Sequence, residues 1–174
     1  MSGISNLLNL QLKMKDNKID ILIINRSDEY LNEYISPYAE RLQFVTNFSG
    51  SAGKAIIFQN EAYLYVDGRY TFQAKEQINE SEIKLKHLNL FWEELKNFIT
   101  KTNFKIAVDP KLHSIKEIQK IQEYIKNTST KIEFLESNII DSIWENKPKK
   151  KYSKIFDHSI KYAGDDRVKK LIDF

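Results

Sequence analysis

The chain has 174 residues, of which 41% are hydrophobic and 12% aromatic, and this is enough apolar material for one sizeable core. It contains no cysteine, which excludes disulfide bonds and thiolate metal ligands, and its formal net charge of +3 at pH 7 is too small to indicate a nucleic-acid partner. No apolar run approaches the roughly 20 residues of a membrane span, and the N-terminal residues lack the apolar stretch of a secretion signal. We therefore expect a cytoplasmic protein with no membrane or nucleic-acid partner.

The chain opens with an expected helix and an expected strand. Ser5 is a suitable N-cap, and the cations among residues 15–18 suit a helix C-terminus. The apolar stripe of this helix would consist of Leu7, Leu8, Leu12 and Met14. Residues 19–24, with the sequence IDILII, are almost all apolar and β-branched, which predicts a strand covered on both faces.

Residues 47–74 combine a glycine-rich turn, a hairpin and an Asp-Gly-Arg-Tyr corner in the sequence NFSGSAGKAIIFQNEAYLYVDGRYTFQA. The small residues at 49–53 allow positive φ angles or a close approach of another segment. The apolar runs 54–59 and 62–66, separated by two polar residues, predict a buried antiparallel hairpin. A helix from Arg69 to Ile78 is expected to follow, so Arg69 and Tyr70 would lie where a strand turns into a helix.

The second half alternates between strand and helix patterns. Ser114 and Glu117 form a capping-box pattern, which opens a helix that continues through Ile125. The other expected elements are an edge strand at 83–88, a helix at 90–99, strands at 105–108 and 131–135, and a short helix at 139–144. This order predicts an α/β domain whose mixed β-sheet is flanked by helices, mixed because the central hairpin is antiparallel.

Several of these segments resemble one known family. The segments are Glu33-Tyr34-Ile35-Ser36-Pro37 followed by a charged helix with Arg41, Phe48-Ser49-Gly50-Ser51-Ala52-Gly53, Val66-Asp67-Gly68-Arg69-Tyr70, Val108-Asp109-Pro110, and Asp141-Ser142-Ile143-Trp144-Glu145-Asn146-Lys147-Pro148. Over residues 20 to 150, their order and spacing resemble the N-terminal domain of the creatinase/prolidase-like metallopeptidases. Within that group they are most similar to the cytosolic, three-domain Xaa-Pro aminopeptidases.

The resemblance implies an enzyme that removes the N-terminal residue from peptides with proline in second position. It also implies two divalent metal ions, usually manganese, in a C-terminal domain that nothing in this chain matches. We therefore expect residues 1–150 to be the creatinase-type N-terminal domain, and residues 151–174 to be a linker and the start of a truncated second domain. The resemblance gives this domain no catalytic residue and no metal ligand, and implies that it shapes the substrate cleft and supports a homodimer.

Arg69 is the candidate substrate-binding residue. The resemblance implies that it contacts the peptide substrate at the mouth of the cleft, where a planar guanidinium can hold a carboxylate or carbonyl in fixed geometry. Its local sequence is equally consistent with a purely structural role, in which Arg69 forms an ion pair within the domain. Tyr70 would assist by stacking or hydrogen bonding, or would lie in the core. Trp144 and Pro148 resemble interdomain packing residues.

Other candidates have simpler interpretations. His87, His113 and His158 are far apart in sequence and lack metal-ligand spacing, so we expect ordinary histidines. The basic run 147–151 predicts a solvated linker rather than a phosphate site. Two alternatives for the whole chain remain open: a stand-alone, catalytically inactive peptide-binding module, and the N-terminal domain of a prolidase or creatinase-like hydrolase.

Overall fold

The computed structural model describes residues 5–101 and 103–174, and within them a six-stranded sheet has the strand order β4-β3-β2-β1-β5-β6. The strands are β1 (Ile21–Asn25), β2 (Gly53–Phe58), β3 (Ala62–Val66), β4 (Lys84–His87), β5 (Lys105–Val108) and β6 (Lys131–Phe134). The α-helices are α1 (Asn6–Asp16), α2 (Arg41–Thr46), α3 (Thr71–Gln77), α4 (Phe91–Ile99), α5 (Ile115–Ile125), α6 (Ile160–Ala163) and α7 (Arg167–Ile172). Short 3₁₀ turns are η1 (Pro37–Ala39), η2 (Gly68–Tyr70), η3 (Leu88–Leu90) and η4 (Pro110–Leu112).

The sheet is mixed, as predicted, because β2 runs antiparallel to both of its neighbours. A short turn joins β2 to β3, which antiparallel pairing allows, and the register pairs Ile57 with Ala62 beside that turn. The remaining pairs, β1–β5, β5–β6 and β3–β4, are parallel. Parallel neighbours need a crossover, and α3 and α5 provide it for β3–β4 and β5–β6. The expected α/β class is therefore confirmed.

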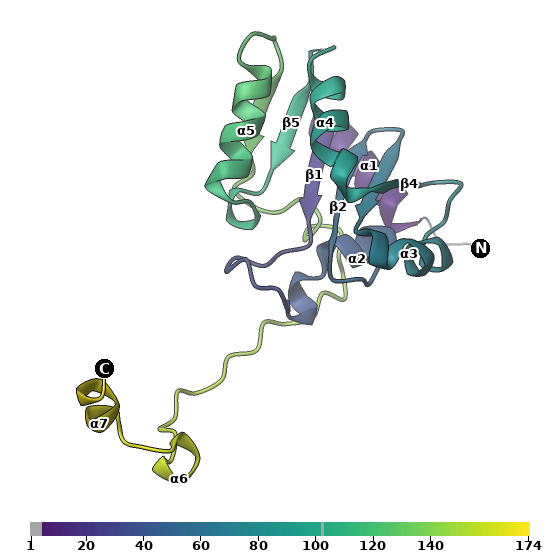
Figure 1. Ribbon diagram of the computed structural model, residues 1–174. Helices are drawn as coiled ribbons and strands as arrows, with labels where there is room; N and C mark the ends of the chain where they lie inside the picture. The colour runs from purple at the N-terminus through teal and green to yellow at the C-terminus, as the bar shows by residue number, and fades with distance from the viewer. Residues whose placement is uncertain (1–4, 102) are drawn as a thin grey trace.

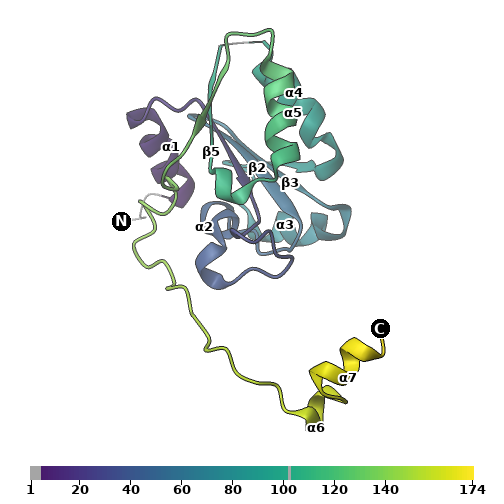
Figure 2. The ribbon, with the colours of Figure 1, turned by 90° about the vertical axis from the view of Figure 1, so that its left-hand side faces the viewer.

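Helices cover the sheet on both faces. Helices α1, α2 and α3 pack on one face, and α4 and α5 pack on the other, so the sheet forms the middle layer (Figures 1 and 2). The core of the first face includes Leu10, Leu42 and Ala74, and that of the second face includes Leu95 and Ile121. Every residue of β1 is buried, which confirms the prediction of a strand covered on both sides.

The N-terminal helix forms where it is expected, but it turns a different face to the core. Ser5 caps it, accepting a hydrogen bond from the Leu8 amide at 3.2 Å. The buried side is made of Leu7, Leu10, Gln11 and Met14. Leu8 and Leu12, which we assigned to the apolar stripe, are 46% and 43% exposed. Gln11 is tolerated inside because its Nε2 donates to the Phe58 carbonyl at 3.0 Å.

The helix predicted at 139–144 is wrong. The chain instead makes consecutive turns, with the amides of Asp141 and Ser142 donating to the carbonyls three residues before them at 3.1 and 3.2 Å. Ile139 and Ile140 are buried in the first core, so tertiary packing holds this segment. The apolar spacing that resembled a helix reflects that packing.

Other element boundaries differ by a few residues. The 3₁₀ turns η2 and η3 precede α3 and α4, so both helices begin later than expected, and β1 begins at Ile21 rather than residue 19. Both hydrogen bonds of the capping box at Ser114 and Glu117 form, as predicted. The segment α2 with Arg41 is a short helix, and Arg41 is its one charged residue.

Beyond residue 150 the chain leaves the layered domain. Residues 151–159 have no regular secondary structure, and α6 and α7 lie away from the sheet (Figure 1). A division of the chain into domains at residue 150 stays a prediction. In the described part of the chain, no helix combines the length and the apolar character that crossing a membrane requires.

Candidate functional site

The Asp-Gly-Arg-Tyr corner lies at the carboxyl end of β3. Asp67 is in extended conformation and begins η2, because its carboxylate accepts a hydrogen bond from the Arg69 amide at 3.0 Å. The same Oδ1 accepts a second bond from Nε of Arg69 at 2.8 Å. One carboxylate thus fixes both the backbone and the side chain of Arg69 at the edge of the sheet, where α/β proteins commonly place functional groups.

Arg69 is held at its base and open at its tip. Its side chain is 75% exposed, and its guanidinium carbon lies 5.7 Å from the centre of the Tyr70 ring. Neither terminal nitrogen donates a hydrogen bond to a residue that the structure describes. The hydrogen bond from Arg69 lowers the pKa of Asp67, and Asp67 raises the pKa of Arg69, so the pair stays charged. A guanidinium edge free for two parallel hydrogen bonds suits a carboxylate or carbonyl ligand.

The glycine-rich turn packs tightly beneath this corner. A Cβ added to Gly50 would lie 2.2 Å from Cζ of Phe48 and 2.9 Å from Cδ1 of Tyr70. A Cβ on Gly53 would lie 2.9 Å from Cε1 of Phe48. The close approach predicted for these small residues is confirmed, because the rings of Phe48 and Tyr70 lie against Gly50, whereas neither Gly50 nor Gly53 has a positive φ.

Tyr70 joins the turn to the corner. Its ring packs edge-on against Phe48 with centroids 6.0 Å apart, and its hydroxyl lies 2.6 Å from Oγ of Ser51. The ring borders the core, which agrees with one interpretation of Tyr70, and its assistance in binding a substrate stays a prediction. A second link comes from α3, where Nε2 of Gln77 donates to Oγ of Ser49 at 2.9 Å. The turn and the corner thus form one hydrogen-bonded unit.

Arg26 helps to hold the candidate site together, and the sequence patterns did not single it out. Its Nη1 donates to the carbonyls of Glu33 at 3.1 Å and Ser51 at 3.4 Å, and its Nη2 pairs with Glu40 at 2.8 Å. Arg26 therefore ties the loop between β1 and α2 to the glycine-rich turn. The available signal was its position, because it directly follows a buried strand at the same edge of the sheet as Arg69.

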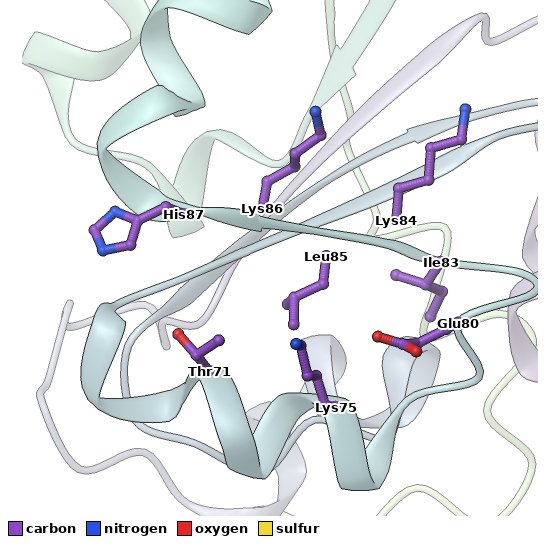
Figure 3. A pocket seen from close by; sticks show the side chains of 8 residues that line it. All are labelled: Thr71, Lys75, Glu80, Ile83, Lys84, Leu85, Lys86 and His87. Carbon is purple, nitrogen blue, oxygen red and sulfur yellow. The ribbon is translucent and has the colours of Figure 1, made fainter.

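A shallow groove of ≈ 490 Å³ borders the edge strand β4 next to this corner (Figure 3). It is lined by Thr71, Lys75, Glu80, Ile83, Lys84, Leu85, Lys86 and His87. Leu85 points toward α3, whereas the ammonium groups of Lys84 and Lys86 point away from α3. On that opposite side, Lys84 pairs with Glu61 at 2.8 Å and Lys86 pairs with Glu94 at 3.2 Å. Charged side chains along an edge strand discourage pairing with another strand.

The three histidines are not brought together. His87 ends β4, His113 precedes α5, and His158 lies in the segment after residue 150. Burial lowers the pKa of His113, whose Nδ1 lies 2.9 Å from the Asp109 carbonyl oxygen. Among residues 5–101 and 103–174, no three His, Asp or Glu side chains are grouped so that they could hold a metal ion.

Trp144 and the basic run are more closely tied to the domain than the sequence suggested. The Trp144 ring stacks on Phe44 of α2 with centroids 4.5 Å apart. The run 147–151 is not simply solvated, because Lys147 pairs with Asp141 at 2.6 Å and Lys150 pairs with Glu29. Whether a neighbouring domain covers Trp144 and Pro148 stays a prediction.

Residues 7–137 match the sequence model of a family described as the Creatinase/Prolidase N-terminal domain. A probable Xaa-Pro aminopeptidase P from Coccidioides posadasii is 33% identical over 171 residues, which are 96% of this chain and 26% of the relative. A protein of the same name from Paracoccidioides lutzii is 30% identical over 92% of this chain and 27% of its own length. This chain therefore spans about a quarter of the length of these curated relatives.

Solved structures share the fold. An X-prolyl aminopeptidase from Caenorhabditis elegans, described as a cytosolic enzyme with a di-nuclear active site, superposes with a TM-score of 0.83 at 20% identity, covering 96% of this chain and 30% of that one. The N-terminal domain of the cytoplasmic peptidase PepQ from Mycobacterium tuberculosis superposes with a TM-score of 0.62 at 16% identity, covering 81% of this chain and 99% of that domain.

Proposed function

The chain belongs to the creatinase/prolidase N-terminal domain family, and from this premise we propose that it is the non-catalytic N-terminal domain of an Xaa-Pro aminopeptidase. Such an enzyme removes the N-terminal residue from peptides whose second residue is proline. The proposal is supported by relatives of that name that align with 92% to 96% of this chain. The domain would wall off the substrate cleft and contribute to a homodimer in the cytoplasm, in keeping with the cytosolic nematode neighbour.

The proposed substrate contact is Arg69. The observation that carries this assignment is the free guanidinium edge of Arg69, anchored by Asp67 and 75% exposed at the carboxyl edge of the sheet. A purely structural role would be met by the pair of Nε with Asp67 alone, which leaves the two exposed terminal nitrogens unused. Arg69 would instead orient the peptide through its charge and planar geometry, and it would supply no proton to the reaction.

The metal chemistry of this enzyme would lie in another domain. In the proposed enzyme, two divalent ions, manganese in our proposal, would supply an activated water molecule for hydrolysis. The described residues offer no cluster of ligands for such ions, so their binding would fall to the catalytic domain. The contribution of this chain is then confined to binding and enclosing the peptide.

The test is Arg69→Ala in a polypeptide that carries this domain together with its catalytic domain. We expect kcat/KM on Xaa-Pro-Yaa peptides to fall by about tenfold or more, because a charge-assisted hydrogen bond contributes about 1.5–3 kcal/mol. Bound metal and the unfolding temperature should not change. Lys75→Ala is the matched control, since it removes an equal charge from the exposed face of α3 near the corner. An unchanged kcat/KM, or loss of metal or folding, would assign Arg69 a structural role.

Two alternatives are separated by substrate and by reaction. A prolidase would cleave Xaa-Pro dipeptides in preference to Xaa-Pro-Yaa peptides, and solved prolidases share this fold, one from Pyrococcus horikoshii with a TM-score of 0.56 at 17% identity. A catalytically inactive binding module would bind the peptides and cleave neither class. Assays on matched peptide pairs of both lengths therefore distinguish the aminopeptidase from both competitors.

A further inference from the structure

Lys150 lies among tyrosine rings at the point where the chain leaves the domain. Its Nζ is 4.7 Å from the ring centre of Tyr30, 5.3 Å from that of Tyr38 and 5.6 Å from that of Tyr152. It also forms an ion pair with Glu29 and donates to the Tyr30 hydroxyl at 3.2 Å. A single ammonium thus meets a carboxylate and three aromatic faces, which is the arrangement that recognises cations.

We call the Glu29 carboxylate and the rings around Lys150 the Lys150 cage. Glu29, Tyr30 and Tyr38 of this cage lie on the loop between β1 and α2. Buried Asp28 shapes this loop by accepting bonds from the amides of Tyr30 and Asn32, both at 3.0 Å. Tyr38, in η1, donates its hydroxyl to Oε2 of Glu29 at 2.7 Å, which leaves Oε1 for Lys150. The backbone of Tyr30 and the hydroxyl of Tyr38 are therefore held by the domain itself, whereas Tyr152 belongs to the segment that leaves it.

A second lysine attaches the same stretch to the domain. Nζ of Lys147 lies 2.6 Å from Oδ2 of Asp141, whose carboxylate also receives two bonds from the buried Arg41. Lys147 and Lys150 lie on either side of Pro148, whose ring restricts the intervening backbone. The two ammonium groups reach different partners, on the 138–144 turns and on the 28–38 loop.

We propose that Lys147 and Lys150 form a two-point clamp that fixes the direction in which the chain leaves the domain. Flexibility then begins after Lys150, and the clamp determines where the segment after residue 150 starts relative to the carboxyl edge of the sheet. An isolated surface ion pair would be too weak for this task. Here the combination of an ion pair, the two ring faces of Tyr30 and Tyr38, and a second anchor restrains the stretch cooperatively.

The test measures the position of residue 151 relative to the rigid helix α5. The chain has no cysteine, so Lys116→Cys and Lys151→Cys give a unique pair of spin-label sites for pulsed electron paramagnetic resonance. In the otherwise unchanged chain we expect a narrow distance distribution. Lys150→Met should release residues 148–151, and a flexible stretch of about four residues has an r.m.s. span of roughly 11 Å. The distribution should broaden on that scale.

The controls separate the clamp from general effects. Lys149→Met removes the same charge from an exposed neighbour that makes no ion pair or ring contact with a described residue, and it should leave the distribution narrow. Lys150→Arg should retain the clamp, whereas Glu29→Gln should release it. A label pair at Lys75→Cys and Lys116→Cys checks that the domain itself is unchanged. An equally broad distribution before and after Lys150→Met, or equal broadening by Lys149→Met, overturns the proposal.

Discussion

Gly50 and Arg26 show how single residues build the corner around Arg69. The lack of a side chain at Gly50 allows the Phe48 and Tyr70 rings to lie against the backbone of the turn. Arg26 donates a hydrogen bond to the same turn, through the Ser51 carbonyl. The position of Arg69 therefore depends on residues that would not touch a ligand themselves.

Gly50→Ala should destabilise the domain by about 1–3 kcal/mol, because the added methyl group would overlap the buried Phe48 ring. Gly68→Ala is the comparison. Its Cβ would lie 3.1 Å from Nε2 of His87, the tip of a side chain that can move, so we expect a change within about 0.5 kcal/mol. Urea unfolding of both variants measures the difference. Equal stabilities of the two variants would show that the turn relaxes around position 50.

At this scale the sequence predicted the type of residue better than its partners. The corner, the small turn and Arg69 itself could be identified from a local pattern. The contacts of Arg26 with Ser51 and of Tyr70 with Ser51 join residues 25 and 19 positions apart. No local pattern specifies which of several hydroxyls or carbonyls such a side chain reaches, because the folded sheet determines it.

At the scale of elements, capped helices and buried strands were the most predictable. Ser5 and Ser114 cap the helices assigned to them, because a cap depends on residues only three positions apart. The prediction of which face of α1 points inward was partly wrong, since four leucines compete for that face and the packing of α1 in the fold, including against α2, decides which are covered. The prediction of a helix at 139–144 was wrong for a similar reason, because Ile139 and Ile140 are buried by a segment that forms turns.

The ion pair between Arg41 and Asp141 joins α2 to these turns, and Asp141→Asn should cost about 2–4 kcal/mol of stability at pH 7. The substitution leaves the guanidinium of Arg41, a residue only 8% exposed, without its counter-charge. Glu61→Gln, which breaks the exposed pair with Lys84, is the control and should cost less than about 1 kcal/mol. Similar losses in the two variants would contradict a special role for Asp141.

The same pair predicts a dependence of stability on pH. Burial alone would raise the pKa of Asp141, but hydrogen bonds from Arg41 and Lys147 outweigh burial and lower that pKa below its ordinary value of 3.8. Because the folded pKa is the lower one, the stabilisation is complete above the unfolded pKa and disappears as the pH falls through the folded pKa. Urea unfolding between pH 6 and roughly pH 2 should therefore show a larger loss in the parent chain than in Asp141→Asn. Parallel pH profiles would refute this linkage.

At the scale of the whole molecule, the core extends beyond the residues that match the family's sequence model. That match ends at residue 137, whereas Ile139 and Ile140 close the first core and Asp141 anchors Arg41. After residue 150 the side chains contribute nothing comparable, since Ile155 and Phe156 are 102% and 79% exposed. The stability of the domain should therefore depend on residues up to about 150 and not on the segment that follows.

Two shortened chains test where the folding unit ends. A chain of residues 1–150 should unfold within about 2 °C of the parent chain, because it keeps both cores and the Asp141 pair. A chain of residues 1–138 loses Ile139 and Ile140, each contributing about 1.5–3 kcal/mol by burial, so its unfolding temperature should fall by roughly 10 °C or more. Scanning calorimetry on the three chains provides the comparison. If removing residues 151–174 alone lowered the unfolding temperature strongly, those residues would have to pack on the domain, and the proposed exit of the chain at Lys150 would be wrong.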